Sequence, residues 1–149
     1  MNIEIRIAHS SDIESITKLH GDLSDMHDLI DPIHSIGAWN SEEYKIDLAK
    51  QIEDNDFHVS VAEIDSIIVG YCIVAIKNNT LGHIWEIYVD PIHRKNGVGT
   101  KLYENAMQWL RKCGVKTVYL YVDSRNEIGL KAWESFGFKE YMKKMKLDL

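Results

Sequence analysis

A short glycine-containing segment combines residue types that bind phosphate. Its residues are Arg94, Lys95, Asn96, Gly97, Val98, Gly99 and Thr100. The segment follows an apolar strand pattern and opens an amphipathic helix pattern, and the first N–H groups of a helix point outward without partners inside the helix. Gly97 and Gly99 lack the Cβ atoms that would hold a diphosphate away from the backbone, and Arg94 and Lys95 place positive charge beside it. The segment therefore predicts a site for a phosphate-bearing cofactor.

The spacing of the two glycines excludes two other nucleotide-binding motifs. It matches neither G-x-G-x-x-G nor G-x-x-x-x-G-K-[ST], so the sequence has neither a Rossmann fingerprint nor a P-loop here. The alternative interpretation is a structural turn between a strand and a helix, with incidental basic residues. The strand pattern before the segment and the helix pattern after it favour the phosphate site.

The elements that must position this segment follow from hydrophobic periodicity. Strands are predicted at 3–7, 57–61, 67–76, 84–89 and 117–122, and one or two closing strands at 138–149. Helices are predicted from about 13 to 31, from Ser41, from Gly97 to Gly114, and from 126 to 136, with Ser11 and Glu14 spaced as a capping box. The order β-α-α-β-β-β-α-β-α-β predicts one α/β-type domain over residues 1–149, with a mixed sheet covered by helices.

Acidic residues concentrate in the first 56 positions of the chain. The net charge is −6, with −9 over residues 1–56 and +3 over residues 57–149. An acidic chain is disfavoured as a nucleic-acid binder, because that affinity comes mainly from neutralised phosphates. The asymmetry suggests an anion-binding C-terminal half and an N-terminal half that receives a cation. The alternative is that the acidic side chains only solvate surface helices.

The remaining sequence features concern the cellular compartment of the protein and metal binding. Cys72 and Cys113 lie in apolar patterns far apart, which predicts buried free thiols in a reducing compartment. The N-terminus lacks a signal-peptide pattern and the longest apolar run is too short to span a bilayer, so we expect a cytoplasmic protein without membrane contact. His20, His27 and His34 are spaced by seven, but Pro32 interrupts the helix and no carboxylate–histidine cluster has ligand spacing, so we expect no metal.

Two motifs of the chain resemble those of the GCN5-related N-acetyltransferases, the GNAT family. The first is the strand around Ile87-Tyr88-Val89-Asp90-Pro91 followed by Arg94-x-x-Gly97-x-Gly99 and a helix. The second is the strand at 118–122, then Asn126, then a short helix ending in Gly137-Phe138. The resemblance spans nearly the whole chain and is specific from about residue 67 onward.

The resemblance implies a fold, a cosubstrate and a reaction. The sheet would be mixed and mostly antiparallel, with a splayed parallel strand pair that holds acetyl-CoA. The pantetheine arm would pair with the backbone around Ile87, Tyr88 and Val89, the segment from Arg94 to Thr100 would bind the diphosphate, and Asn126 would bond the pantetheine side. The acceptor would be a primary amine of a small molecule or a protein, and a homodimer is common in the family. The alternative is a non-catalytic acyl-CoA-binding regulatory domain.

Glu86 is the candidate catalytic base. It shares a face of its strand with Tyr88, opposite Ile87 and Val89, and a carboxylate in an apolar strand must face a wet cleft or a partner. It would act directly or through water, and the alternative is a structural salt bridge.

The general acid is left unassigned. Many relatives have a tyrosine seven residues after the asparagine, whereas this chain has Trp133, which cannot donate a proton as an acid. The tryptophan would pack against the cofactor arm or in the core. Tyr121, Tyr141 or water remain as proton donors. His34 and Trp39 lie where relatives have the loop that borders the acceptor cleft, as loop anchors or as substrate contacts.

Overall fold

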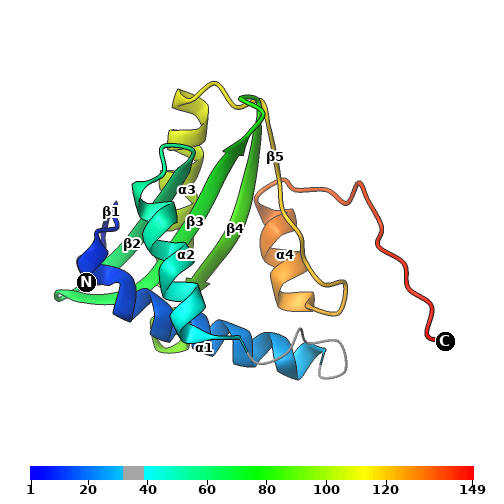
Figure 1. Ribbon diagram of the computed structural model, residues 1–149, viewed down its shortest axis with the longest axis horizontal. Helices are drawn as coiled ribbons and strands as arrows, with labels where there is room; N and C mark the ends of the chain where they lie inside the picture. The colour runs from blue at the N-terminus through cyan, green and yellow to red at the C-terminus, as the bar shows by residue number, and fades with distance from the viewer. Residues whose placement is uncertain (32–38) are drawn as a thin grey trace.

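Five strands form one mixed sheet in the order β1-β2-β3-β4-β5 (Figure 1). The structure is a computed structural model that describes residues 1–31 and 39–149. The strands are β1 (Glu4–Ile7), β2 (Phe57–Ile64), β3 (Ile67–Lys77), β4 (Leu81–Val89) and β5 (Thr117–Tyr119). The first four pair antiparallel, and β5 pairs parallel to β4. This is the mixed, mostly antiparallel sheet expected from the sequence.

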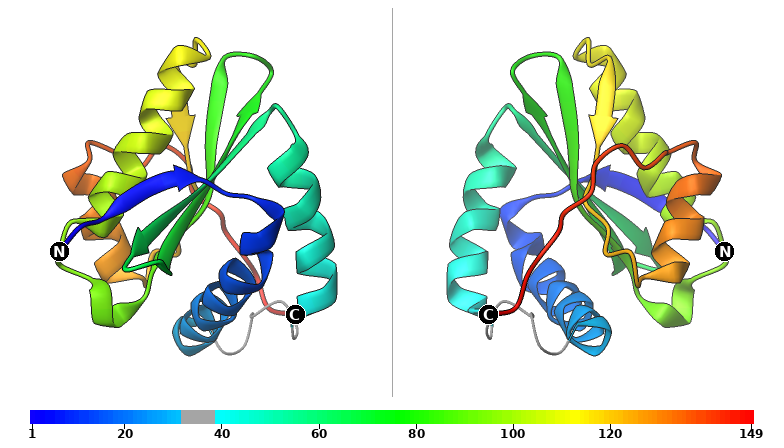
Figure 2. Two further views of the ribbon diagram at one scale, coloured as in Figure 1. Left: turned by 90° about the vertical axis from the view of Figure 1, so that its left-hand side faces the viewer. Right: turned by 90° about the vertical axis from the view of Figure 1, so that its right-hand side faces the viewer.

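Helices cover both faces of the sheet (Figure 2). The helices α1 (Ile13–Ile30) and α2 (Ser41–Glu53) lie on one face, and α3 (Val98–Lys112) lies on the other with α4 (Glu127–Ser135) beside it. Two 3₁₀ turns, η1 (Ser10–Asp12) and η2 (Pro91–His93), precede α1 and α3. None of the described helices is long and apolar enough to cross a membrane.

Each face of the sheet has its own core, because the side chains of a strand alternate between faces. The core on the α3 face includes Cys72, Val74, Ile84, Val98, Leu102, Ala106, Met107 and Leu110. The core on the α1–α2 face includes Ile16, Leu19, Leu48, Val59, Val61, Tyr71, Ile73 and Tyr88. The sheet therefore separates a side on which α3 begins from a side on which α1 and α2 pack.

A β-bulge in β4 decides which face each of its side chains occupies. Ile73 pairs with Glu86 while the next residue, Val74, pairs with Ile84, so Trp85 is the extra residue. Ile84 and Ile87 consequently both pack on the α3 face. Glu86 contacts side chains of the α1–α2 face, which is also the face of Tyr88.

The tail departs most from the sequence-based prediction. Closing strands were expected at 138–149, but these residues form none, and the tail runs away from α4 (Figure 1). The prediction was wrong because a strand requires a ladder partner as well as alternation, and β5 has only three paired residues rather than the six expected. The apolar tail side chains stay exposed: Tyr141, Met142, Met145, Leu147 and Leu149.

Two smaller expectations were also wrong. The capping box at the start of the first helix is formed by His9 and Asp12 rather than Ser11 and Glu14, because residues 10–12 form a 3₁₀ turn in which Asp12 accepts from the His9 N–H. Cys113 is exposed rather than buried, because α3 ends at Lys112 and the core-facing positions of its last turns are Met107 and Leu110. Cys72 is buried as expected.

Candidate functional site

The strands β4 and β5 separate before β4 ends. Their parallel pairing runs from Leu81 and Thr117 to His83 and Tyr119. Beyond this point β4 continues for six residues to Val89, whereas the chain after Tyr119 leaves the sheet. Figure 1 shows the two segments diverging toward the end of the sheet where α3 begins. This confirms the splayed parallel pair.

The ladder between β3 and β4 shows which backbone groups of β4 face this gap. Gly70 pairs with Val89, and the Asp90 N–H donates to the Val69 carbonyl at 2.8 Å. In an antiparallel ladder, hydrogen-bonded and non-hydrogen-bonded pairs alternate. The pairs made by Ile87 and Val89 are therefore non-hydrogen-bonded, and the N–H and C=O groups of both residues point away from β3, toward the gap.

The loop after β4 turns sharply into α3. Asp90 Oδ1 accepts from the Ile92 N–H at 3.0 Å and fixes the first turn of the loop. Lys95 has φ of 62° and Gly97 has φ of 83°, both in the left-handed region, and Gly97 caps α3. The first backbone hydrogen bond of α3 runs from the Lys101 N–H to the Gly97 carbonyl at 3.0 Å. The N–H groups of Val98, Gly99 and Thr100 come before this bond, have no acceptor within the helix and point out of its start.

The space in front of this loop suits a diphosphate. Apart from its neighbours along the chain, a Cβ atom at Gly97 would meet no described atom within 4 Å, and one at Gly99 would meet only a Val89 methyl group at 3.8 Å. The backbone is therefore open to a ligand at both glycines, and the helix dipole adds partial positive charge. An anion approaching here meets unpaired N–H groups rather than side chains.

Arg94 folds back onto the end of β4. Its Nε donates to the Val89 carbonyl at 2.8 Å, and its guanidinium lies 5.2 Å from the centre of the Tyr88 ring. Arg94 is exposed, and so are Lys95, Asn96 and Thr100. The Arg94 guanidinium, the positive charge expected beside the glycines, is therefore hydrogen-bonded to the end of β4 next to the gap between β4 and β5.

Glu86 lies in a polar cluster on the α1–α2 face of the sheet. Its Oε1 accepts from His20 Nδ1 and from the Tyr71 hydroxyl at 3.1 Å, and its Oε2 accepts from the Tyr44 hydroxyl at 3.2 Å. The His20 ring stacks on Tyr44 with centroids 3.8 Å apart, and the Trp39 ring lies nearly perpendicular to it in an edge-to-face contact, with centroids 5.1 Å apart. We call His20, Tyr44, Tyr71 and Glu86 the Glu86 cluster.

The two tyrosines of the cluster act as fixed donors. Burial, and after it the adjacent Glu86 carboxylate, raise the pKa of the Tyr44 hydroxyl well above its ordinary value. The same two causes raise the pKa of the Tyr71 hydroxyl. Both hydroxyls therefore remain protonated across the physiological range, and neither can accept a proton from a substrate.

Sequence reasoning did not assign His20, Tyr44 or Tyr71 to the site. The spacing of the histidines makes His20 a candidate for metal binding alone, yet it follows Ile16 by one helical turn and so lies on the apolar side of its helix. Tyr71 lies in a central strand whose neighbours are apolar, where a hydroxyl requires a partner. These polar groups on buried faces were the available signal. His34, the last of the three histidines spaced by seven, lies outside the described residues.

Asn126 and Trp133, from the second of the two family motifs, lie at opposite ends of α4. Asn126 Oδ1 accepts from the Gly129 N–H at 2.9 Å and caps α4, so its amide nitrogen remains for a ligand. Trp133 packs against the core on the α3 face, with its ring 5.5 Å from that of Phe138. Tyr121 and Tyr141 are 79% and 75% exposed. The cofactor contacts of Asn126 and Trp133 and the general acid stay predictions.

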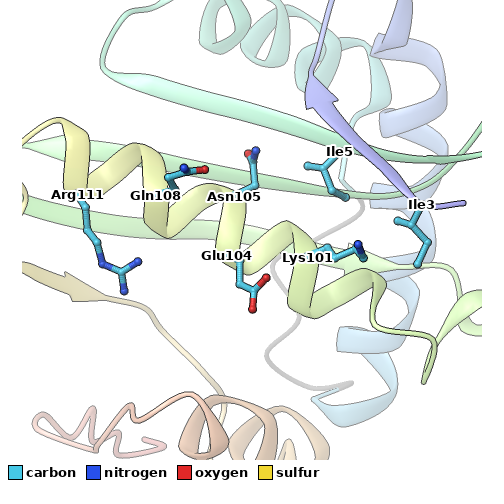
Figure 3. A pocket seen from close by; sticks show the side chains of 7 residues that line it. All are labelled: Ile3, Ile5, Lys101, Glu104, Asn105, Gln108 and Arg111. Atoms are coloured by element: carbon cyan, nitrogen blue, oxygen red, sulfur yellow. The ribbon is translucent and has the colours of Figure 1, made fainter.

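Two surface hollows lie away from Glu86 and from the loop that opens α3. One of about 550 Å³ lies between β1 and α3, with Ile3 and Ile5 facing the polar side chains of α3 (Figure 3). The other, of about 800 Å³, is lined by the paired end of β5, by α3 and by the start of the tail, and its lining includes Tyr121 and Tyr141. Neither contains Glu86 or residues 94–100, the loop between β4 and α3 that we call the glycine loop. The site is therefore defined by the diverging strands and not by the hollows.

Comparisons with known proteins agree with this geometry. The sequence profile of the Acetyltransferase (GNAT) family matches residues 23–138. The chain is 31% identical over 107 residues to the mycothiol acetyltransferase of Thermomonospora curvata, covering 70% of this chain and 35% of the relative. It is 24% identical over 144 residues to the L-methionine sulfoximine/L-methionine sulfone acetyltransferase of Salmonella typhimurium, covering 90% and 78%.

A solved structure is also similar over nearly the full chain. The PaiA N-acetyltransferase of Thermoplasma acidophilum, crystallised in complex with coenzyme A, superposes with a TM-score of 0.86 at 25% identity, covering 97% of this chain and 94% of that one. The chain spans about a third of the length of the Thermomonospora relative. Since the family profile covers most of the chain, including β4, the glycine loop and α4, the chain belongs to the acetyltransferase (GNAT) family.

Proposed function

We propose that this chain transfers an acetyl group from acetyl-CoA to a primary amine of a small molecule or a protein. The observation that carries the proposal is the course of β4 beyond its pairing with β5. There the N–H groups of Ile87 and Val89 and the Ile87 carbonyl face the gap, and the chain continues into the glycine loop at the start of α3. An amide-containing arm can pair with such groups as an added strand does. The diphosphate at its end would then reach the loop.

The residues for each part of the cosubstrate follow from this arrangement. The N–H and C=O groups of Ile87 and the N–H of Val89 would bond the acetyl-pantetheine arm beside Tyr88. The N–H groups from Lys95 to Thr100, with Arg94, would hold the diphosphate. The Asn126 amide nitrogen would bond the arm from the opposite side of the gap, and Trp133 would border it. Acetyl-CoA supplies the activated acetyl group as a thioester.

The reaction requires a donor for the carbonyl oxygen and an acceptor for a proton. A free amine with a pKa near 10.4 is mostly protonated at neutral pH and must lose a proton before or during attack. The Val89 N–H points into the gap and would donate to the oxyanion. Glu86 lies next to the gap on the α1–α2 face and is the carboxylate around which proton removal would be organised.

The acceptor would be cationic and would approach from the α1–α2 face. Acidic residues predominate in the first 56 positions, and Asp28, Glu42 and Glu43 are exposed on α1 and α2. The name of the Salmonella relative describes acetylation of methionine derivatives, which supports a small α-amino acid as one candidate. A homodimer and a cytoplasmic location complete the proposal.

The test is an acetyl-CoA assay that follows free thiol with a panel of amines. The panel contains L-methionine sulfone, lysine, spermidine and a peptide with a free N-terminus. Amine-dependent thiol release supports the proposal. Tight binding of acetyl-CoA without such release would support the second candidate, a non-catalytic acyl-CoA-binding regulatory domain, which Trp133 in the tyrosine position favours. A melting temperature that CoA leaves unchanged would contradict both.

A further inference from the structure

We infer that His20 of α1, rather than Glu86, takes the proton from the acceptor amine, and that Glu86 acts by positioning the His20 ring. The inference rests on the proposed acetyl transfer and names the residue that performs its proton step. It follows from the hydrogen bonds of the Glu86 cluster, from the packing of the His20 ring and from the face of the sheet on which both lie.

The oxygens of Glu86 are largely occupied by donors from the protein. A carboxylate oxygen has about two acceptor positions. Oε1 accepts from His20 Nδ1 and from the Tyr71 hydroxyl, and Oε2 accepts from the Tyr44 hydroxyl. An amine that gave its proton directly to Oε1 would have to displace one of these donors, and the Tyr71 side chain is fully buried and cannot move away.

The same bonds leave His20 with one free nitrogen. An ionised carboxylate only accepts, so Nδ1 of His20 carries the proton of that contact. In the neutral ring Nε2 is then unprotonated, and no described residue hydrogen-bonds to it. Stacking on Tyr44 at 14° between planes and the edge contact with Trp39 hold the ring in one orientation. The side chain is 19% exposed, so an acceptor can reach it.

Three titratable side chains face the His20 ring in the described part of the chain, and each comes from a different element. Glu86 faces it from β4, Tyr71 from β3 and Tyr44 from α2. The tyrosines are held as neutral donors, so Glu86 is the charge that contacts the ring. A proton accepted at Nε2 makes an imidazolium whose Nδ1–H is paired with that carboxylate, as in other His–carboxylate pairs of catalytic sites.

In the proposed reaction, His20 both accepts the proton that the amine loses and returns it to the leaving thiolate. The amine nitrogen bonds to the thioester carbonyl carbon, the carbonyl electron pair moves to oxygen, and Nε2 of His20 takes the proton that nitrogen loses. When the carbonyl re-forms, the carbon–sulfur bond breaks and its electron pair leaves on sulfur. The imidazolium returns the proton to this thiolate, directly or through water, so the products are the acetylated amine and neutral CoA. His20 would thereby also fill the unassigned acid role.

The test compares His20→Gln, Glu86→Gln, the double variant and a control, His27→Gln, whose exposed histidine lies on the same helix. Circular dichroism and melting temperature establish that each is folded. With the best amine of the panel, we expect His20→Gln to lower kcat by about 100-fold or more, with the KM for acetyl-CoA unchanged, and His27→Gln to change kcat by less than about twofold. Added imidazole should restore part of the activity of His20→Ala.

Two further outcomes distinguish the proposals. If Glu86 acts through His20, the double variant should be no slower than His20→Gln alone, because residues that act as a unit are not additive. A folded His20→Gln variant that keeps kcat within about threefold of wild type while Glu86→Gln does not would overturn the assignment of His20. If the wild-type protein binds acetyl-CoA and releases no thiol with any amine, the proposed function itself fails before any variant is compared.

Discussion

His20 Nδ1 donates to the carboxylate of Glu86 although the two residues are 66 positions apart in the sequence. The contact exists only because α1 packs on the face of the sheet toward which the bulge at Trp85 turns Glu86. The polar centre of the site is therefore a product of packing, and it can be tested through stability as well as through activity.

Tyr71 should stabilise the fold through its bond to Glu86. Replacing it by phenylalanine removes a buried hydroxyl that donates to a carboxylate at 3.1 Å, and hydrogen bonds to charged groups contribute about 1.5–3 kcal/mol. Urea unfolding at pH 7 should show Tyr71→Phe destabilised by that amount. The control is Tyr103→Phe, whose hydroxyl has no hydrogen-bond partner in the described part of the chain, with a change within about 0.5 kcal/mol. Equal changes in both variants would contradict the role of Tyr71.

Alanine variants of the two glycines in the glycine loop should have different effects on stability and similar effects on CoA affinity. Gly97→Ala places a side chain at φ of 83° and should cost about 1–2 kcal/mol of stability, since the space around it is open and only the backbone is strained. Gly99→Ala meets one methyl group at an ordinary 3.8 Å and should leave stability unchanged. Both should weaken CoA binding by roughly tenfold or more, measured by calorimetry, because each adds a Cβ in front of the diphosphate.

Gly114 is the matched control for Gly97. It has φ of 81° and equally open surroundings, but it lies at the far end of α3. Gly114→Ala should therefore lose stability as Gly97→Ala does and keep wild-type CoA affinity. If Gly114→Ala weakens CoA binding as strongly, the effect at Gly97 comes from general destabilisation and not from the loop.

The two cysteines should differ sharply in reactivity. Cys113 is exposed, whereas burial, with a smaller contribution from Glu86, raises the pKa of the Cys72 thiol to about 12. The thiolate is the reactive form, so at pH 8 Cys72 is both inaccessible and protonated. Ellman's reagent should label one thiol in the native protein and both in guanidinium chloride. Fast labelling of native Cys113→Ser would show that Cys72 is accessible.

Asp12 should contribute stability that depends on pH. Arg6 donates to both of its oxygens, at 2.8 and 3.0 Å, and these bonds hold the pKa of Asp12 below its ordinary value in spite of burial. A depressed folded pKa adds stability above the unfolded pKa of about 3.9, and this stability is lost as pH falls through the folded value. Asp12→Asn should be destabilised by about 1–2 kcal/mol at pH 7.

The difference between wild type and Asp12→Asn should shrink as the pH is lowered below about 4, because protonation then removes the same charge from the wild type. Urea titrations at pH 7 and pH 3 measure it. Asp28→Asn, an exposed position on α1, serves as the control and should show little difference at either pH. A penalty for Asp12→Asn that is independent of pH would indicate a packing effect instead of a charge effect.

Local signals in the sequence predicted the loop, most elements and the family. The motif from Val89 to Gly99 is contiguous in the sequence. It could be predicted because the end of a strand, a turn and the start of a helix each depend on neighbouring residues. The helix starts at Ser41 and near Gly97, the central strand at 67–76 and the splayed pair agree with the structure. The same local reasoning failed at the tail, where alternation was present but the partner strand was too short.

The sequence by itself determined that Glu86 shares a face with Tyr88, since alternation beyond residue 86 is regular. It did not determine which face this is, because one extra residue at Trp85 exchanges the two sides of β4 and has no local signature. The tertiary structure placed that face under α1 and α2, where His20, Tyr44 and Tyr71 surround the carboxylate. The glycine loop is encoded by contiguous residues, whereas the Glu86 cluster requires four elements to pack together.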